Sequence, residues 1–204
     1  MDAENINKKI KNRVPSILGL SDFAKYAVLL PLIKKDNEWH ILFEIRSFQM
    51  RRQPGEICFP GGRIDEEDKT DQMAAIRETR EELGIGNEQI YDVSPLDYFV
   101  SPFGMIIYPH IGFIKDDHLI DPNPAEVEDI FTVPLSFFLD TDPTIHYVNA
   151  RIEPEKDFPL DLIPGGEDYN WRTRKIDEYF YIYEDNVIWG LTAKILAHFI
   201  EMIK

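Results

Sequence analysis

Apolar positions along this chain follow two spacings, which together predict an alternation of strands and helices. Continuous or alternating apolar runs predict strands, whereas apolar residues three or four positions apart predict helices. The predicted strands cover residues 27–32, 39–46, 93–100, 106–114, 128–134 and 179–183. The predicted helices cover residues 5–18, a segment that begins at Thr70 or Asp71, residues 135–139 and residues 189–202. Strands and helices mixed in this way favour an α/β fold of stacked layers.

The pattern divides the chain into an N-terminal helical extension, residues 1–26, and one domain, residues 27–204. Pro15 interrupts the helical spacing of the extension, so a short or kinked helix is expected there. Residues 153–168 are rich in proline, glycine and charge and follow no period, which predicts a long loop. An ordinary surface loop, a lid and the arm of a homodimer all fit that composition.

Composition limits the class of protein. The 204 residues are 44% hydrophobic, which suits one globular domain, and no apolar run approaches the roughly 20 residues that span a bilayer. A net charge of −15 disfavours binding to nucleic acid, and no membrane partner is expected. The start of the chain lacks the pattern of a secretory signal, and the single cysteine, Cys58, cannot form an internal disulfide. We therefore expect a reducing, cytoplasmic setting, with Cys58 as a small packing residue.

Three glutamates lie close together on the predicted helix after residue 70: Glu78, Glu81 and Glu82. A helix turns about 100° per residue, so with Glu78 at zero, Glu81 lies at about −60° and Glu82 at about +40°. The apolar residues of the helix fall on the opposite side: Met73, Ile76 and Leu83. One face is therefore expected to pack and the other to gather negative charge. A solvated acidic face explains such glutamates, but so does a divalent cation, which would relieve their mutual repulsion.

The flanks of this helix favour the cation. Phe59-Pro60-Gly61-Gly62 precedes it, and paired glycines let backbone approach a ligand closely. Arg77 lies beside the glutamates and can hold one of them through a forked pair of hydrogen bonds. Gly84 is typical of a helix end.

Residues 77–85, Arg-Glu-Thr-Arg-Glu-Glu-Leu-Gly-Ile, resemble the second half of the Nudix hydrolase signature. Thr79 stands where that family usually has an apolar residue. The first half departs more, because the spacing from Gly62 to Arg77 is one residue longer and an acidic cluster, residues 65–68, replaces a single glutamate. These departures resemble a subfamily, the coenzyme A pyrophosphatases. In that subfamily the signature, also called the Nudix box, has the longer spacing and has Asp where this chain has Asp65 and Asp68.

A second motif upstream adds to this resemblance. Coenzyme A pyrophosphatases carry Arg-Ser/Ala, three residues, Arg, three residues, Gly, three residues and Phe-Pro-Gly-Gly, and residues 46–62 match this motif throughout. Just before it the subfamily usually has a Leu-Leu-Thr-like run, where this chain has Leu42-Phe43-Glu44. Residues 124–127, 131–135 and 188–193 match further, so the resemblance runs from about Ala27 to the C-terminus.

The resemblance implies a mixed sheet between helices, the Nudix α/β/α sandwich, and a site that uses Mg²⁺ or Mn²⁺. It implies Glu78 and Glu82 as the principal metal ligands and Glu81 as a ligand of a second ion or through water. Arg77 would orient these carboxylates.

The general base is open between a box glutamate and a downstream carboxylate. Glu126 matches the Pro-x-Glu-Val position of the subfamily, Glu128 is the alternative, and either fits equally well as an exposed acid at a strand start. The candidate catalytic residues are therefore Glu78, Glu81 and Glu126.

Arginines gather around the glycine turn despite the negative net charge: Arg46, Arg51, Arg52 and Arg63. They are either ordinary surface residues or phosphate-binding residues, for which forked guanidinium donors are suited. The candidate substrate-binding residues are Arg46, Arg51, Arg52, Gly61 and Gly62.

Three hypotheses follow for function. The first is hydrolysis of the diphosphate in coenzyme A or acyl-coenzyme A, which by resemblance gives 4′-phosphopantetheine, or its acyl form, and adenosine 3′,5′-bisphosphate. The second is the same chemistry on ADP-ribose, a dinucleotide or a nucleoside triphosphate. The third is a non-catalytic nucleotide-binding module, against which the intact glutamate triad weighs.

Overall fold

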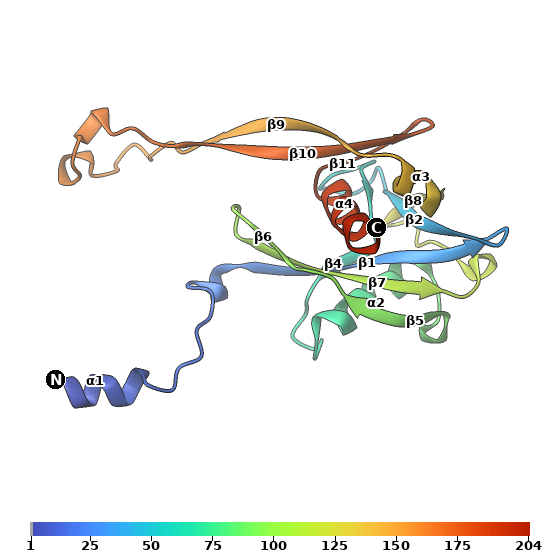
Figure 1. The fold of residues 1–204 in the computed structure, drawn as a ribbon, viewed down its shortest axis with the longest axis horizontal. Coiled ribbons are helices and arrows are strands. Elements are labelled where there is room, and N and C mark those ends of the chain that lie inside the picture. The colour runs from blue at the N-terminus through green and yellow to red at the C-terminus, as the bar shows by residue number, and fades with distance from the viewer. Residues whose placement is uncertain (1) are drawn as a thin grey trace.

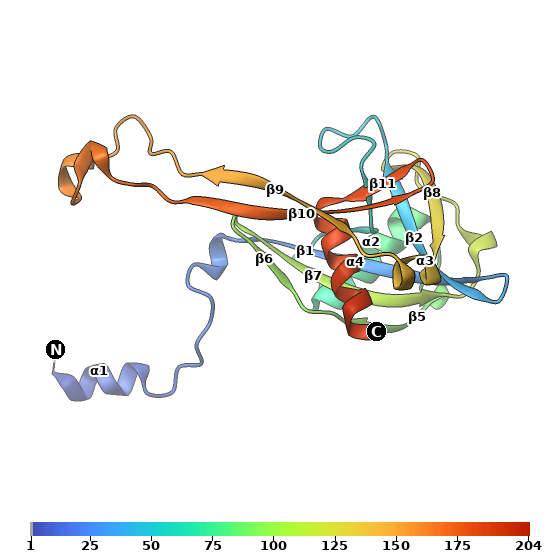
Figure 2. The same ribbon diagram turned by 45° about the horizontal axis from the view of Figure 1, so that its top comes forward.

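The computed structural model describes residues 2–204, which form two sheets and four α-helices (Figures 1 and 2). The main sheet contains β1 (Ala24–Lys35), β2 (Glu38–Arg46), β3 (Ile57–Cys58), β4 (Gly61–Arg63), β5 (Ile90–Pro95), β6 (Phe99–Ser101), β7 (Met105–Ile114) and β8 (Val127–Pro134). The smaller sheet contains β9 (Thr144–Arg151), β10 (Thr173–Tyr183) and β11 (Asn186–Trp189). The helices are α1 (Ala3–Ile10), α2 (Asp71–Leu83), α3 (Leu135–Asp140) and α4 (Gly190–Ile203).

The main sheet is mixed. Its central order is β3-β2-β1-β7-β5, with β4 paired to β1, β6 to β7 and β8 to β2. β1 and β7 run parallel from the pair Ala24–Met105 to the pair Ile33–Ile114, whereas the other pairings of the sheet are antiparallel. A parallel pair needs a long crossover, and here the crossover contains α2 and β5.

Helices cover both faces of this sheet (Figure 1). Alternate residues of β1 point to opposite faces, so Leu29 and Ile33 join the buried cluster under α2, whereas Leu30 and Leu32 join the cluster under α4. These two hydrophobic layers, one on each side of the strands, make the α/β/α sandwich that the sequence predicts.

Two segments extend away from the main sheet and its helices: the β9–β10 ribbon and the N-terminal segment that contains α1 (Figures 1 and 2). The antiparallel ribbon of β9 and β10 carries the predicted loop 153–168 at its far end, where it contains the short 3₁₀ helices η4 (Leu160–Leu162) and η5 (Gly166–Asp168). Residues of β9 are mostly exposed on both faces. Roles as a lid or a dimer arm stay predictions.

The N-terminal helix is shorter than predicted. α1 ends at Ile10, whereas the helical spacing predicts a helix as far as residue 18. None of its residues is buried, so packing adds nothing to propensity, and Pro15 prevents continuation. β1 begins at Ala24, before the predicted boundary at 27, and the division into extension and domain stays a prediction.

Several short or exposed strands were missed or merged. The predicted strand 93–100 is two strands, β5 and β6, which pair with different parts of β7. The two- and three-residue strands β3 and β4 are too short for a period to show. The exposed β9 was not predicted, although Ile145 and Tyr147 alternate with polar residues in it. None of the helices in residues 2–204 is long and apolar enough to cross a membrane.

Candidate active site

Helix α2 is set by capping residues at both ends. The Thr70 hydroxyl accepts a hydrogen bond from the backbone N–H of Met73 at 3.1 Å, which confirms Thr70 as the N-cap. Gly84 adopts φ 64°, the left-handed conformation that ends helices, and a side chain there would collide with the backbone of Asp121. The helix therefore begins and ends where the sequence predicts, and its glutamates occupy fixed positions.

Leu83 is buried as predicted, but the helix does not separate cleanly into a packed face and a face that gathers negative charge. Glu82 is only 5% exposed and lies on the packed side with Ala74 and Ala75, whereas Met73 is 47% exposed. Two alanines allow α2 to approach β1 and β4 closely, and the carboxylates then face backbone that carries no side chains, at Gly61 and Gly62.

Buried Glu82 and half-buried Glu78 both meet the glycine turn. The backbone N–H of Gly61 donates to Oε2 of Glu82 at 2.7 Å. A Cβ at Gly62 would lie less than 3.0 Å from the carboxyl of Glu78, so only glycine leaves room for that carboxylate. The turn thus supplies a hydrogen-bond donor to one carboxylate and space to the other.

A fourth carboxylate, Glu44 of β2, lies in the same place, and sequence reasoning assigned it no role. It is 1% exposed, and its Oε1 accepts a hydrogen bond from the Cys58 thiol at 3.3 Å. Leu42, two residues earlier, packs in the α2 cluster, so Glu44 faces the same side of the sheet. A charged residue inside an otherwise apolar strand was the signal available in the sequence.

The downstream candidate Glu126 also reaches this cluster. Asn123 donates to the Glu126 carboxylate at 3.3 Å, and the backbone N–H of Asn123 donates to the carbonyl of Glu82 at 2.9 Å. The carbonyl of Glu126 accepts from Ser47 at 2.8 Å, which ties this loop to the upstream motif. Glu128 is exposed, and no recorded contact within residues 2–204 joins its side chain to the cluster.

Burial and crowding alter the protonation of these carboxyls. Burial, then the nearby Glu44 carboxylate, raises the pKa of Glu82 to about 9, although the Gly61 hydrogen bond opposes the shift. Burial raises the pKa of Glu44 to about 7, and burial also raises the pKa of Glu78. Such shifts mean that the negative charge lacks a counter-charge here, and a divalent cation with oxygen ligands would supply one.

Arg77 organises the outer side of the cluster. Its guanidinium donates to both oxygens of Asp68 at 3.2 and 2.8 Å, to Glu78 at 2.9 Å and to Glu81 at 3.2 Å. It also donates to the carbonyl of Arg63 at 3.2 Å. The hydrogen bonds from Arg77 lower the pKa of Asp68. Asp68, a member of the acidic cluster at residues 65–68, therefore anchors Arg77. Arg77 thus contacts Glu78 and Glu81, as predicted for an orienting residue.

We expect Arg77→Lys to lower kcat/KM by about 10–100-fold, because an ammonium cannot make the forked contacts that position Glu78 and Glu81. The concentration of Mn²⁺ that gives half-maximal activity should rise as well. Arg80→Lys is the matched control, since Arg80 lies exposed on the same helix. Equal metal dependence in Arg77→Lys and in the unmutated protein would contradict the orienting role.

The predicted substrate-binding arginines differ in setting. Arg46 is half-buried at a β-bulge between β2 and β8, and its buried Nε has no hydrogen-bond partner in the described part of the chain. Arg51 and Arg52 are exposed on the loop that follows. Within residues 2–204, no carboxylate oxygen lies within 4.0 Å of any of the three guanidinium groups. Their charge is therefore available to an anionic ligand.

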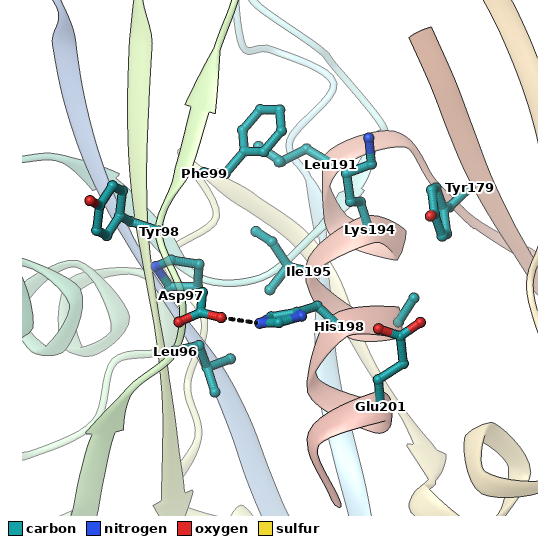
Figure 3. A pocket seen from close by; sticks show the side chains of 12 residues that line it. Leu96, Asp97, Tyr98, Phe99, Tyr179, Leu191, Lys194, Ile195, His198 and Glu201 are labelled. Carbon is teal, nitrogen blue, oxygen red and sulfur yellow. Dashed lines mark hydrogen bonds and ion pairs between the residues drawn. The ribbon is translucent and has the colours of Figure 1, made fainter. Parts of the chain in front are cut away.

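Two cavities of about 270 Å³ lie near α4. One is lined by Arg46, Cys58 and Thr192, among others, so it adjoins the carboxylate cluster through Cys58. Figure 3 shows the other, where His198 points from α4 toward Asp97 with 3.0 Å between Nε2 and Oδ2. The residues described as lining this second cavity include none of the box glutamates, which lie on the α2 side of the sheet.

The carboxylate oxygens of the box glutamates do not form a compact group of ligand atoms. Among residues 2–204, the one group of three or more ligand atoms within 4.8 Å of one another belongs to Asp116, Asp117 and His118. That group is largely exposed, and Lys35 already pairs with Asp117 at 3.4 Å. The box carboxylates repel one another and Arg77 holds Glu81 outward, so their oxygens stay further apart.

Comparison with known proteins identifies the family. A family model described as NUDIX domain matches residues 24–152. The chain belongs to the Nudix family. The Nudix match begins with β1 and includes the glycine turn, α2 and Glu126, so the carboxylate cluster lies within it.

Two relatives extend this Nudix assignment. The chain is 36% identical over 134 residues to peroxisomal coenzyme A diphosphatase NUDT7 of Mus musculus, a match covering 66% of the chain and 56% of the mouse protein. It therefore spans just over half of that relative's length. It is 33% identical over 186 residues to an uncharacterized Nudix hydrolase, NudL, of Photorhabdus laumondii, covering 91% of the chain and 88% of the relative.

A solved structure supports the Nudix fold. A MutT/nudix family protein from Enterococcus faecalis superposes with a TM-score of 0.54 at 13% identity, covering 100% of this chain and 70% of that one. At this identity the likeness concerns the fold alone.

Proposed function

We propose that this protein hydrolyses the diphosphate of coenzyme A or an acyl-coenzyme A, in a reaction that depends on Mg²⁺ or Mn²⁺. The observation that carries the proposal is the packing of Glu78 and Glu82 against the side-chain-free turn at Gly61 and Gly62. This turn is also the end of the motif that resembles the coenzyme A pyrophosphatases. One stretch of chain therefore unites the candidate reaction centre with the candidate substrate motif.

The carboxylates present fit a divalent cation. Glu78 and Glu82 would be its principal ligands, with Glu81 bound to a second ion or through water. When bound, the cation would neutralise diphosphate charge and lower the pKa of a coordinated water. Arg77 would hold Glu78 and Glu81 in position, and the Gly61 N–H would fix one oxygen of Glu82.

Hydrolysis requires a base that takes a proton from water. The water oxygen forms a bond to one phosphorus, the bond from that phosphorus to the bridging oxygen breaks, and the bridging oxygen leaves with the other phosphate. Glu126 is our candidate to accept the proton, because Asn123 orients its carboxylate and the loop is fixed to Glu82 and Ser47. Glu78 and Glu81 remain candidates for catalytic roles in the same site.

The choice of coenzyme A rests on the upstream motif and on one relative. The mouse relative is named a coenzyme A diphosphatase, and it matches two thirds of this chain. Arg46 lines the cavity beside Cys58 with an unpartnered Nε, which suits recognition of a phosphate. The products from coenzyme A would be 4′-phosphopantetheine and adenosine 3′,5′-bisphosphate.

A substrate panel tests the proposal. Purified protein is incubated with Mg²⁺ or Mn²⁺ and with coenzyme A, ADP-ribose, a dinucleotide or a nucleoside triphosphate, and the products are identified by mass spectrometry. We expect coenzyme A to give the highest kcat/KM and the two named products. Faster turnover of ADP-ribose would favour the second hypothesis, and ligand binding without hydrolysis at saturating metal would favour a non-catalytic module.

Arg46→Ala should raise KM for coenzyme A by about 10–100-fold, because a charge-assisted hydrogen bond contributes about 1.5–3 kcal/mol. The KM for ADP-ribose should change much less if Arg46 reads a phosphate specific to coenzyme A. Arg51→Ala and Arg52→Ala, measured in the same way, test the exposed pair. Equal effects on both substrates would show that Arg46 recognises only the shared diphosphate.

The remaining proposals concern setting and partners. Cys58 is free, which agrees with a reducing compartment, and we keep a cytoplasmic location and the absence of nucleic-acid and membrane partners as proposals. The peroxisomal location in the name of the mouse relative belongs to that protein. A homodimer through the β9–β10 ribbon also stays a proposal.

A further inference from the structure

Glu44 is a buried carboxylate whose second oxygen has no partner. Its Oε1 accepts a hydrogen bond from the Cys58 thiol at 3.3 Å, but Oε2 is buried and makes no hydrogen bond to any described residue. Buried polar atoms in folded proteins nearly always have a partner, and an unpaired carboxylate oxygen is among the most costly exceptions. The unpartnered oxygen therefore points to a group that binds there.

The surroundings of Glu44 are dominated by negative charge. The pKa of Glu44 is raised by the charges of Glu126 and Glu78 in addition to burial. The charge of Glu44 in turn raises the pKa of Glu82. Arg46 is the positive neighbour that reduces this repulsion, yet no carboxylate oxygen among the described residues lies within 4.0 Å of its guanidinium. Arg77 is engaged on the outer side, with Asp68, Glu78 and Glu81. On the inner side of the cluster, no described basic side chain therefore forms an ion pair with these carboxylates.

Strand pairing brings Glu44 close to Glu82. Glu44 pairs with Cys58 in the β2–β3 register, and Gly61, three residues after Cys58, donates to Glu82. Burial raises the pKa of the Cys58 thiol, and the nearby Glu44 and Glu82 carboxylates raise it further. The thiol therefore stays protonated and can serve as a donor to Glu44.

We propose that Glu44 is a further metal ligand, whose Oε2 binds the same divalent cation as Glu82. The Cys58 thiol holds Oε1 and so orients the carboxylate toward the ion. This inference rests on the proposed function, because it assumes the cation bound by Glu78 and Glu82. It adds a ligand from β2, outside the box helix, at a position where the resemblance gives a Thr-containing run.

Metal binding tests the inference without any measurement of turnover. Mn²⁺ affinity is measured by electron paramagnetic resonance and by the shift in unfolding temperature, for the unmutated protein, Glu44→Gln and Glu82→Gln. Gln keeps the size of Glu and an oxygen for the Cys58 thiol, but it removes the charge. We expect Glu44→Gln to weaken Mn²⁺ binding by about 10-fold or more and to remain as stable as the unmutated protein without metal.

The two variants separate failure of the inference from failure of the proposed function. Weak binding in Glu82→Gln with unchanged binding in Glu44→Gln overturns the inference and leaves the proposed function standing. Unchanged binding in both variants overturns the metal site itself. If Glu44→Gln does not fold, Glu44→Asp, which keeps the charge but withdraws it by one methylene, gives the same decision: unchanged affinity overturns the inference.

Discussion

Glu82→Gln should abolish most turnover while the fold stays intact. Because the metal-free pKa of Glu82 is about 9, this side chain is largely neutral at pH 7, and neutral Gln replaces it with little change. A Gln oxygen can still accept the Gly61 hydrogen bond. A cation, in contrast, needs the charged form, so we expect kcat/KM to fall by at least about 10²-fold, or about 2.7 kcal/mol.

Two measurements check this expectation. Thermal unfolding without metal should give nearly the same midpoint for both proteins, whereas Mn²⁺ at 100 times its Kd should stabilise only the unmutated protein, by about 2.7 kcal/mol. Glu88→Gln is the control, because Glu88 is an exposed carboxylate to which no role in the site is assigned. Full activity in Glu82→Gln would show that Glu82 is not a ligand, and an equal loss in Glu88→Gln would show that the effect is not specific to the carboxylate cluster.

The parts of the site that depend on local chain geometry could be predicted from the sequence. Thr70 and Gly84 set the ends of α2 through contacts within a few residues, and cap preferences record such contacts directly. The pair of Arg77 with Glu81 follows from positions four residues apart on a helix. Each of these features needs no knowledge of the sheet.

The packed face of α2 could not be predicted in the same way. A helical wheel weights large apolar residues, so it selected Met73 and passed over Ala74 and Ala75. The side that packs was decided by the partner: small residues on α2 meet β1 and the bare backbone of β4, and this close approach buries Glu82. Information about a partner such as Gly61, 21 positions before Glu82, is absent from the local period.

Glu44 was missed for a related reason. Its neighbours Leu42 and Phe43 predict a buried strand, but only the pairing with β3 and the side on which α2 packs bring Glu44 to the carboxylate cluster. The sequence did carry one signal, a charge within an apolar strand. A buried charge is costly unless something compensates it, so such a residue points to a site even before the partner is known.

Gly62→Ala should damage both activity and stability, although the change adds a single methyl group. The new Cβ would lie less than 3.0 Å from the carboxyl of Glu78, which Arg77 holds at 2.9 Å and so prevents from moving aside. We expect overpacking to cost about 1–3 kcal/mol in the free energy of unfolding. Displacement of Glu78 by even about 1 Å should lower kcat by about 10²-fold.

A control glycine and a second substitution isolate the cause. A Cβ at Gly86 would also crowd a glutamate, Glu88, but that side chain is exposed and free to turn away, so Gly86→Ala should be nearly silent. In a Glu78→Ala background the methyl at position 62 has room, and the loss of stability from Gly62→Ala should largely vanish. If the loss persists there, the glycine is required by the backbone of the turn, and Glu78 does not occupy the space that its missing side chain leaves.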